Sequence, residues 1–93
     1  ALELAANSTD SLLLGLVKNR IGLIYLNLGK YELAEEFLLK NLLIQGYHRD
    51  NRREADAFNN LGILFMKKAD YETAKNHYLN SYKLYKKLVL KKT

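Results

Sequence analysis

The chain has 93 residues, of which 48% are hydrophobic and 27% charged, with a net charge of +5 and no proline or cysteine. This balance excludes a disordered chain and fits one small globular domain, while the lack of cysteine excludes disulfides, thiolate metal sites and cysteine nucleophiles. Because Leu, Lys, Glu and Ala are abundant and nothing interrupts long helices, we expect an all-α fold.

The sequence repeats itself with a shift of forty residues, so that "KYELA" at residues 30 to 34 returns as "DYETA" at residues 70 to 74. A period in this range is typical of stacked repeats. We expect one domain over residues 1 to 93, with repeat 1 at residues 11 to 45 and repeat 2 at residues 51 to 90. The identical pairs that set this register are Asn19 and Asn59, Gly22 and Gly62, Tyr31 and Tyr71, Glu32 and Glu72, Ala34 and Ala74, and Leu39 and Leu79.

The stretch "ALELAANSTDSLLLGLV" before and inside the first predicted helix lacks a basic leader, and its apolar run is too short for a membrane span or a signal peptide. We therefore expect a soluble, cytoplasmic protein without a membrane partner. "ALELA" aligns with the ends of two later helices, so residues 1 to 6 are interpreted as the end of a helix from a preceding repeat. The helix face exposed beside that segment predicts self-association.

Each repeat is predicted to contain two helices, at residues 11 to 28 and 31 to 45 and again at 51 to 68 and 71 to 90. Asp10, Asp50 and Asp70 stand where a side-chain oxygen can accept hydrogen bonds from the free amides at a helix start, with Asn51 and Glu54 as an alternative capping box. The inward stripes of the second helices are predicted to be Tyr31, Ala34, Leu38 and Asn41, and Tyr71, Ala74, Tyr78, Ser81 and Tyr85.

The apolar spacing of repeat 2 resembles the tetratricopeptide repeat signature. An aromatic residue, a Leu-Gly pair, a second aromatic, an alanine and a third aromatic follow one another as Phe58, Leu61, Gly62, Phe65, Ala74 and Tyr78. Repeat 1 keeps Ile21, Gly22, Tyr25 and Ala34 but has Lys18 and Leu38 at two large or aromatic positions, and its length exceeds the usual 34 residues. The resemblance implies an α-α superhelix, or solenoid, of stacked antiparallel helix pairs.

The resemblance also implies a concave surface that is lined by the first helices and holds an extended peptide or a partner segment. Asparagine can grip a peptide backbone with both a donor and an acceptor, and aliphatic residues can seat its side chains. A merely solvated helix face is the alternative. The predicted peptide-binding residues are Asn19, Arg20, Leu23, Asn27, Asn59, Asn60, Ile63 and Lys67. A complete carboxylate clamp is not expected, because Leu16 and Asp56 stand where lysine would be needed.

The second helix of repeat 2 is predicted to close the stack with a polar face. Repeat 1 has Leu33, Phe37 and Leu43 where repeat 2 has Thr73, His77 and Lys83, which suggests that repeat 2 is a C-terminal cap. The positive charge is also concentrated there, because five lysines follow residue 82 whereas residues 1 to 82 hold ten basic and ten acidic residues. We interpret these lysines as the solvated side and end of the last helix, rather than as a site for nucleic acid or another anionic partner.

No catalytic or metal-ligating pattern is found in the sequence. His48 and His77 lack partners at a metal-ligand spacing, and His77 is predicted on an outer face. No phosphate-binding loop, nucleophile elbow or Ser-His-Asp set can be assembled. We therefore expect no enzyme activity, no metal and no cofactor. The alternatives to a peptide-binding module are a structural spacer or dimerisation element and the sensor part of a peptide-responsive bacterial regulator.

Overall fold

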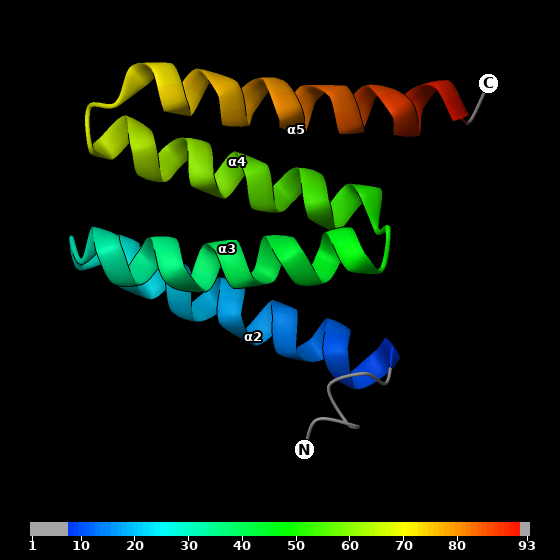
Figure 1. The fold of residues 1–93 in the computed structure, drawn as a ribbon, viewed down its shortest axis with the longest axis horizontal. Coiled ribbons are helices and arrows are strands. Elements are labelled where there is room, and N and C mark those ends of the chain that lie inside the picture. Colours follow the sequence, from blue (N-terminus) through cyan, green and yellow to red (C-terminus); the bar gives the residue numbers. More distant parts are fainter. Residues whose placement is uncertain (1–7, 92–93) are drawn as a thin grey trace.

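A computed structural model describes residues 8–91 of the chain, and these form four α-helices joined by short turns (Figure 1). The helices are α2 (Ser8–Asn27), α3 (Tyr31–Tyr47), α4 (Asn51–Lys67) and α5 (Tyr71–Lys91). The predicted all-α fold and its helices are confirmed, and α2 begins three residues before its predicted start. The helix end predicted at residues 1 to 6 lies outside the described residues.

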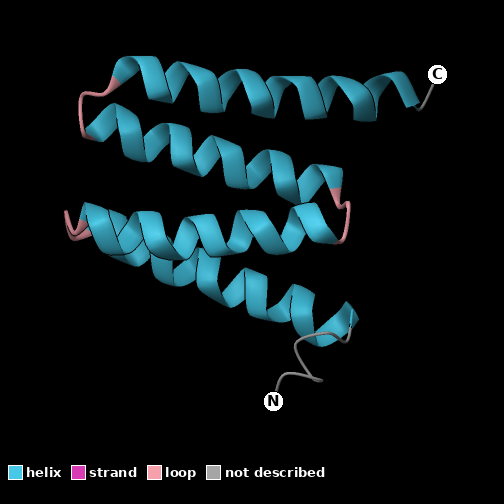
Figure 2. Ribbon diagram, viewed as in Figure 1, coloured by secondary structure: helices cyan, strands magenta, loops and turns pink. Residues whose placement is uncertain are grey.

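The helices are stacked in chain order, each antiparallel to the one before it (Figures 1 and 2). α2 packs on α3, α3 on α4 and α4 on α5, whereas α2 and α4 touch over only a small area. The molecule is a thin slab of 39 × 36 × 15 Å, with the stack running across its broad face. This is the expected arrangement of two antiparallel helix pairs in an α-α superhelix.

The turns after α2, α3 and α4 share one geometry. Gly29, Arg49 and Ala69 have φ values of 78°, 56° and 62° and lie twenty residues apart. The backbone amide of the residue after each of these donates to the carbonyl oxygen five residues earlier. These bonds run from Lys30 to Tyr25, from Asp50 to Gln45 and from Asp70 to Phe65, at 2.9 to 3.1 Å. This is the Schellman ending of a helix. The forty-residue period therefore consists of two similar units, each a helix of 17 residues or slightly more and a three-residue turn.

The residue that completes each turn is also the N-cap of the next helix. Asp50 Oδ1 accepts from the amide of Arg53 at 3.1 Å and Asp70 Oδ1 accepts from the amide of Thr73 at 3.3 Å, which confirms these two predicted caps. The alternative cap at Asn51 is not used, since Asn51 is already helical. Asp10 lies within the first turn of α2 and not at its N-cap. Lys30 precedes α3, and its ammonium group has no oxygen with which to accept.

The core is one continuous cluster that links both helix pairs, and its buried members are Leu26, Ala34, Leu38, Leu61, Leu64, Phe65 and Ala74. Gly22 and Gly62 allow the helices of each pair to approach closely. A Cβ built on Gly22 would lie 2.8 Å from Leu38 Cδ2, and one on Gly62 would lie 2.7 Å from Tyr78 Cε1. In both pairs, therefore, the glycine of the first helix packs against a bulky residue of the second.

Several side chains predicted to be buried or on an outer face lie elsewhere. Tyr71 and Tyr85 were predicted on the inward stripe but are 62% and 39% exposed. Leu43, one of the apolar residues that distinguish repeat 1 from the predicted cap, is 71% exposed. His77 is half-buried and not on an outer face, because its ring stacks on Phe65 at a centroid distance of 5.4 Å and lies tilted against Phe58 at 5.9 Å.

Position 37 of repeat 1 behaves like position 77 of repeat 2. Phe37 stacks on Tyr25 of α2 with a centroid distance of 5.8 Å, just as His77 stacks on α4. Both positions therefore pack against the first helix of their own pair. The exchange of Phe37 for His77 thus gives no support to the cap hypothesis, which stays a prediction. Lys83, Lys86 and Lys87 are exposed on α5, as expected for a solvated helix side.

Candidate functional site

The eight residues of the predicted groove fall into three groups in the structure. Arg20, Asn27, Asn59 and Lys67 are exposed. The two aliphatic residues, Leu23 and Ile63, are half-buried and pack against the core cluster. The remaining two, Asn19 on α2 and Asn60 on α4, are half-buried and bonded to each other.

A chain of side-chain amides crosses from α4 through α2 to α3. Asn60 Nδ2 donates to Asn19 Oδ1 at 2.9 Å, and Asn41 Nδ2 donates to the same oxygen at 3.4 Å. Gln45 Nε2 in turn donates to Asn41 Oδ1 at 3.0 Å. Asn41 and Gln45 are only 4% and 1% exposed. These four residues, which we call the amide chain, tie the two repeats together at the small contact between α2 and α4.

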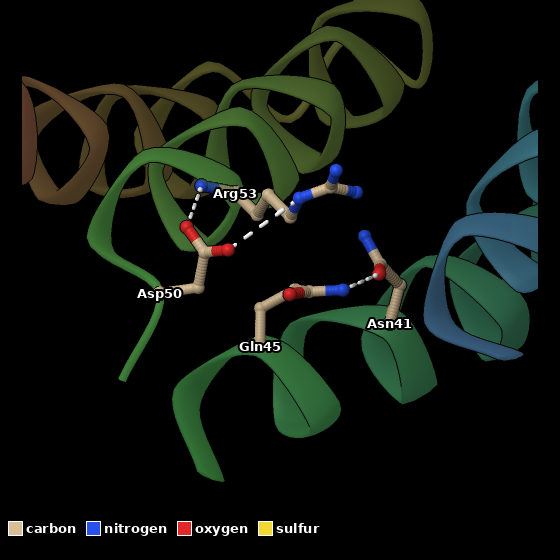
Figure 3. A network of polar contacts seen from close by, with 4 residues as sticks. All are labelled: Asn41, Gln45, Asp50 and Arg53. Atoms are coloured by element: carbon tan, nitrogen blue, oxygen red, sulfur yellow. Dashed lines mark hydrogen bonds and ion pairs between the residues drawn. The ribbon is translucent and has the colours of Figure 1, made fainter. Parts of the chain in front are cut away.

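A small pocket opens where the amide chain ends at Gln45. It has a volume of about 60 Å³ and is lined by Leu16, Asn19, Asn41, Gln45, Arg53 and Asp56. We call it the amide pocket. Figure 3 shows Gln45 next to Asn41, with Asp50 and Arg53 of the α4 start on the other side. Gln45 Oε1 is buried and has no hydrogen-bond partner among the described residues.

The rim of the amide pocket carries one charge of each sign. Arg53 Nε lies 3.4 Å from Asp50 Oδ2, and the Arg53 side chain remains 48% exposed. Asp56 accepts a hydrogen bond from the Tyr85 hydroxyl of α5. This bond to a carboxylate, together with partial burial, raises the pKa of Tyr85. The phenol therefore stays neutral and holds Asp56 in place at the rim.

The stacked pairs, with a glycine of one helix against a bulky residue of the next, are the packing that the tetratricopeptide signature describes. A model of the tetratricopeptide repeat family matches residues 11–87. The chain belongs to this family. No curated protein and no solved structure matches it. Tetratricopeptide repeats generally mediate protein–protein interactions and are non-catalytic modules, so protein partners are indicated for this chain.

The departures of repeat 1 from the tetratricopeptide signature have a local explanation. Lys18 replaces a large residue, and its Nζ lies 5.6 Å from the centroid of the Phe37 ring. In repeat 2 the corresponding contact joins Phe58 of α4 to His77 of α5. The aromatic ring has changed helices between the repeats: it faces Lys18 in repeat 1 and the His77 ring in repeat 2. A cation over a ring face is stabilising, which explains why a lysine is tolerated at this position.

The described residues contain no group of three or more His, Cys, Asp and Glu residues that could hold a metal ion. Within the same part of the chain, no helix is both long and apolar enough to cross a membrane.

The sequence did not point to Gln45 or Arg53 as site residues. Asn41 was placed on the inward stripe of its helix, and the next position of that stripe, four residues on, is Gln45. A glutamine on a stripe that is otherwise buried was the available signal. The sequence contains no comparable signal for Arg53, because its position at the pocket follows from how α4 crosses α2 and α3.

Proposed function

We propose that this chain is a non-catalytic interaction module that binds an extended peptide or partner segment along the first helices, α2 and α4. The observation that carries the proposal is a row of exposed polar residues beside two half-buried aliphatic ones. Arg20, Asn27, Asn59 and Lys67 are free to reach a ligand, and Leu23 and Ile63 offer small apolar seats.

Within this proposal the asparagines divide into two roles. Asn19 and Asn60 hold α2 against α4 through their mutual bond and thereby set the width of the surface. Asn59 and Asn27 are exposed and keep their donors and acceptors for a ligand. Ligand binding should therefore depend most on the exposed members of the row.

A displayed library of random peptides, selected on the full chain, tests the proposal. We expect selected peptides to bind with saturable affinity, and the variant Arg20→Ala/Asn59→Ala to weaken that binding about tenfold, as loss of central contacts does. The control variant Lys75→Ala/Asn76→Ala likewise removes one basic residue and one asparagine, from an exposed part of α5, and should bind like the parent. Equal loss in both variants, or none in either, would contradict the groove.

The structural alternative is supported by a separate observation on α2. Ala57 and Leu64 of α4 are fully buried, on the side where Glu54 and Lys68 contact α3. The corresponding residues of α2, Val17 and Ile24, are 52% and 57% exposed. α2 therefore presents to solvent the kind of face that α4 covers with a neighbouring helix, and it could receive a second helix in a longer stack or in a self-associated form.

Sedimentation over a range of protein concentrations tests this alternative. If the α2 face mediates self-association, Val17→Lys/Ile24→Lys should abolish concentration-dependent association, whereas Leu43→Lys, which changes an exposed leucine of α3, should not. A chain that stays monomeric throughout, or one in which the Leu43 variant has the same effect, would exclude it.

A further inference from the structure

α5 forms the edge of the described stack (Figure 1). α3 packs on α2 and also receives α4, whereas α5 packs on α4 and on no later described helix. The two helices occupy corresponding places in repeats 1 and 2. The contact between α3 and α4 therefore indicates which side of α5 would receive a further helix.

The side of α3 that receives α4 is marked by contacts near its two ends. Glu35 Oε1 lies 3.8 Å from Lys68 Nζ. At the other end, a Cβ built on Gly46 would lie 3.1 Å from Glu54 Oε2. Leu42, between these two positions, packs against the core cluster. Positions 35, 42 and 46 thus define the side of α3 on which α4 lies.

The corresponding side of α5 carries both lysines and apolar residues. Forty residues after the three α3 positions stand Lys75, Tyr82 and Lys86. With Leu79 and Val89 they form a row in which steps of four and three residues alternate, the spacing with which one helix packs on another. We call these five residues the α5 seam. All five are exposed, and the apolar ones, Leu79, Tyr82 and Val89, are exposed by 44%, 61% and 64%.

The α5 seam is positively charged. Glu72, in the first turn, is the only acidic residue of α5, while Lys83 and Lys87 add positive charge beside the seam. Within residues 8–91, neither Lys75 nor Lys86 forms an ion pair. The seam therefore offers two unpaired cations next to exposed apolar side chains.

Two differences from α3 specify the charge of a helix that would fit. Lys75 replaces the glutamate that faces Lys68 of α4, so the fitting helix needs an acidic residue where α4 has this lysine. Lys86 replaces Gly46, which lies next to Glu54 of α4, so an acidic residue at that position gains a cation. The fitting helix is therefore acidic at both ends of the contact.

We propose that the α5 seam binds an acidic amphipathic helix of a partner protein, seated as α4 is seated on α3. Its two acidic residues stand fourteen positions apart, as Glu54 and Lys68 do in α4, and lie opposite Lys86 and Lys75. Apolar residues between them, at the spacing of positions 57, 61 and 64, cover the apolar part of the seam. This surface is separate from the predicted groove, whose residues all lie on α2 and α4.

Other occupants fit the seam less well. The exposed face of α2 in a second copy has Leu14 and Leu28 where α4 has its two charged residues, so it offers the lysines no carboxylate. A bilayer would have to bury Lys86, which interrupts the apolar row, whereas helices that lie in a membrane surface keep lysines on their polar face. Nucleic acid would pair with the lysines through its phosphates but leave the apolar residues without a contact.

Three synthetic helical peptides, titrated into the full-length protein and followed by fluorescence anisotropy, test the proposal. The acidic peptide has Glu, Ala, Leu, Leu and Glu at the spacing of positions 54, 57, 61, 64 and 68, and alanine or glutamine elsewhere. The basic peptide has lysine at both glutamate positions, and the polar peptide keeps the glutamates but has glutamine at the three apolar positions. We expect the acidic peptide to bind saturably and about tenfold more tightly than either of the others.

Binding without this preference would overturn the proposal. So would the absence of binding by all three peptides, which would favour the predicted cap. Stronger binding to phosphatidylserine vesicles or to a short DNA duplex than to the acidic peptide would assign the face to an anionic surface and exclude the helix.

Two matched variants separate a seated helix from general attraction. Lys75→Glu/Lys86→Glu reverses the charge of the seam and should reverse the preference, so that the basic peptide binds better than the acidic one. Lys83→Glu/Lys87→Glu makes the same change in net charge on the same helix but outside the seam, and should keep the preference. All four lysines are exposed, so both variants should retain the fold. Equal effects of the two variants would contradict the seam.

Two further variants test the apolar contact and the location. Tyr82→Ala changes a side chain that is 61% exposed and should weaken binding of the acidic peptide about tenfold, as loss of a central aromatic contact does. The groove variant Arg20→Ala/Asn59→Ala should bind the acidic peptide like the parent. Unchanged binding in the Tyr82 variant, or a loss in the groove variant, would place the peptide elsewhere and overturn the proposal.

Discussion

Repeats 1 and 2 use the same small residues for packing but differ at the polar positions of their second helices. A Cβ built on Gly22 or Gly62 would lie at nearly the same short distance from Leu38 or Tyr78. Asn41 and Gln45, by contrast, are replaced forty residues later by Ser81 and Tyr85. The difference indicates that both repeats share the contacts within a helix pair. The polar residues that reach the next pair differ between the repeats, because each repeat has different neighbours in the stack.

The neighbouring helix explains this difference. α3 lies between α2 and α4, so its polar residues are closed off by helices on two sides and form the amide chain. α5 packs on α4 and on no later described helix. Its tyrosine at position 85 is 39% exposed and bonds to Asp56 on the rim of the amide pocket. The same stripe therefore supplies buried amides in one repeat and a phenol at the surface in the other.

The largest expected effect tests the shared packing. Gly22→Ala and Gly62→Ala should each destabilise the fold by about 2 kcal/mol, because the new methyl group would overlap Leu38 or Tyr78. Gly46→Ala is the control, since its Cβ would lie 3.1 Å from the flexible end of Glu54 and should cost little or nothing. Urea unfolding followed by circular dichroism measures these differences. A cost for Gly46→Ala as large as the other two would contradict close helix approach as the cause.

The amide chain provides the next prediction. Asn41→Ala should destabilise the fold by about 1–2 kcal/mol, because it leaves the Gln45 amide buried without its partner. Replacing both groups in Asn41→Leu/Gln45→Met removes the unpaired atoms together and should cost less than the single change. Ser81→Ala at the corresponding position of repeat 2 serves as the comparison. If the double variant is less stable than Asn41→Ala, the amide chain is not the source of the cost.

The N-caps allow the repeats to be made more alike. Lys30→Asp should stabilise the fold by about 1 kcal/mol, since it gives α3 the capping carboxylate that α5 has in Asp70. Lys30→Ala removes the charge without adding an acceptor and should change stability much less. Thermal unfolding of the two variants against the parent separates capping from charge. No difference between Asp and Ala at position 30 would contradict the capping account.

The smallest expected effect concerns the dependence of stability on pH. Burial against Phe58 and Phe65 lowers the pKa of His77 from its usual 6.5, although the nearby Glu35 opposes the shift. The unfolded chain therefore takes up the proton more readily, and the contribution of His77 to stability falls as the pH drops through about 6.5 and levels off below the folded-state pKa. His77→Phe copies Phe37 of repeat 1 and should flatten the stability profile between about pH 7.5 and 5.5. An unchanged slope in this variant would contradict His77 as its source.

The prediction of the helices and their pairing from sequence succeeded because the signals are local. Asp50 and Asp70 mark helix starts by side-chain geometry, and the glycine and alanine positions mark where two helices meet. The turn at Arg49 lacks a glycine, but Asp50 still marked the start of the helix that follows it. A helix boundary depends on only a few neighbouring residues, so a single sequence contains most of the information.

The candidate site depended on the tertiary structure. Helical periodicity predicted Asn19 and Asn60 on the groove side of their first helices, but only the stack brings Asn60 Nδ2 within 2.9 Å of Asn19 Oδ1. The sequence also determined a buried stripe through Asn41, whereas the unpaired oxygen of Gln45 and its position near Arg53 follow from how α4 crosses the first pair. Periodicity specifies which side of a helix faces its partner in the pair. The angle and offset between successive pairs decide which remaining side chains meet, and these are set by packing across distant parts of the chain.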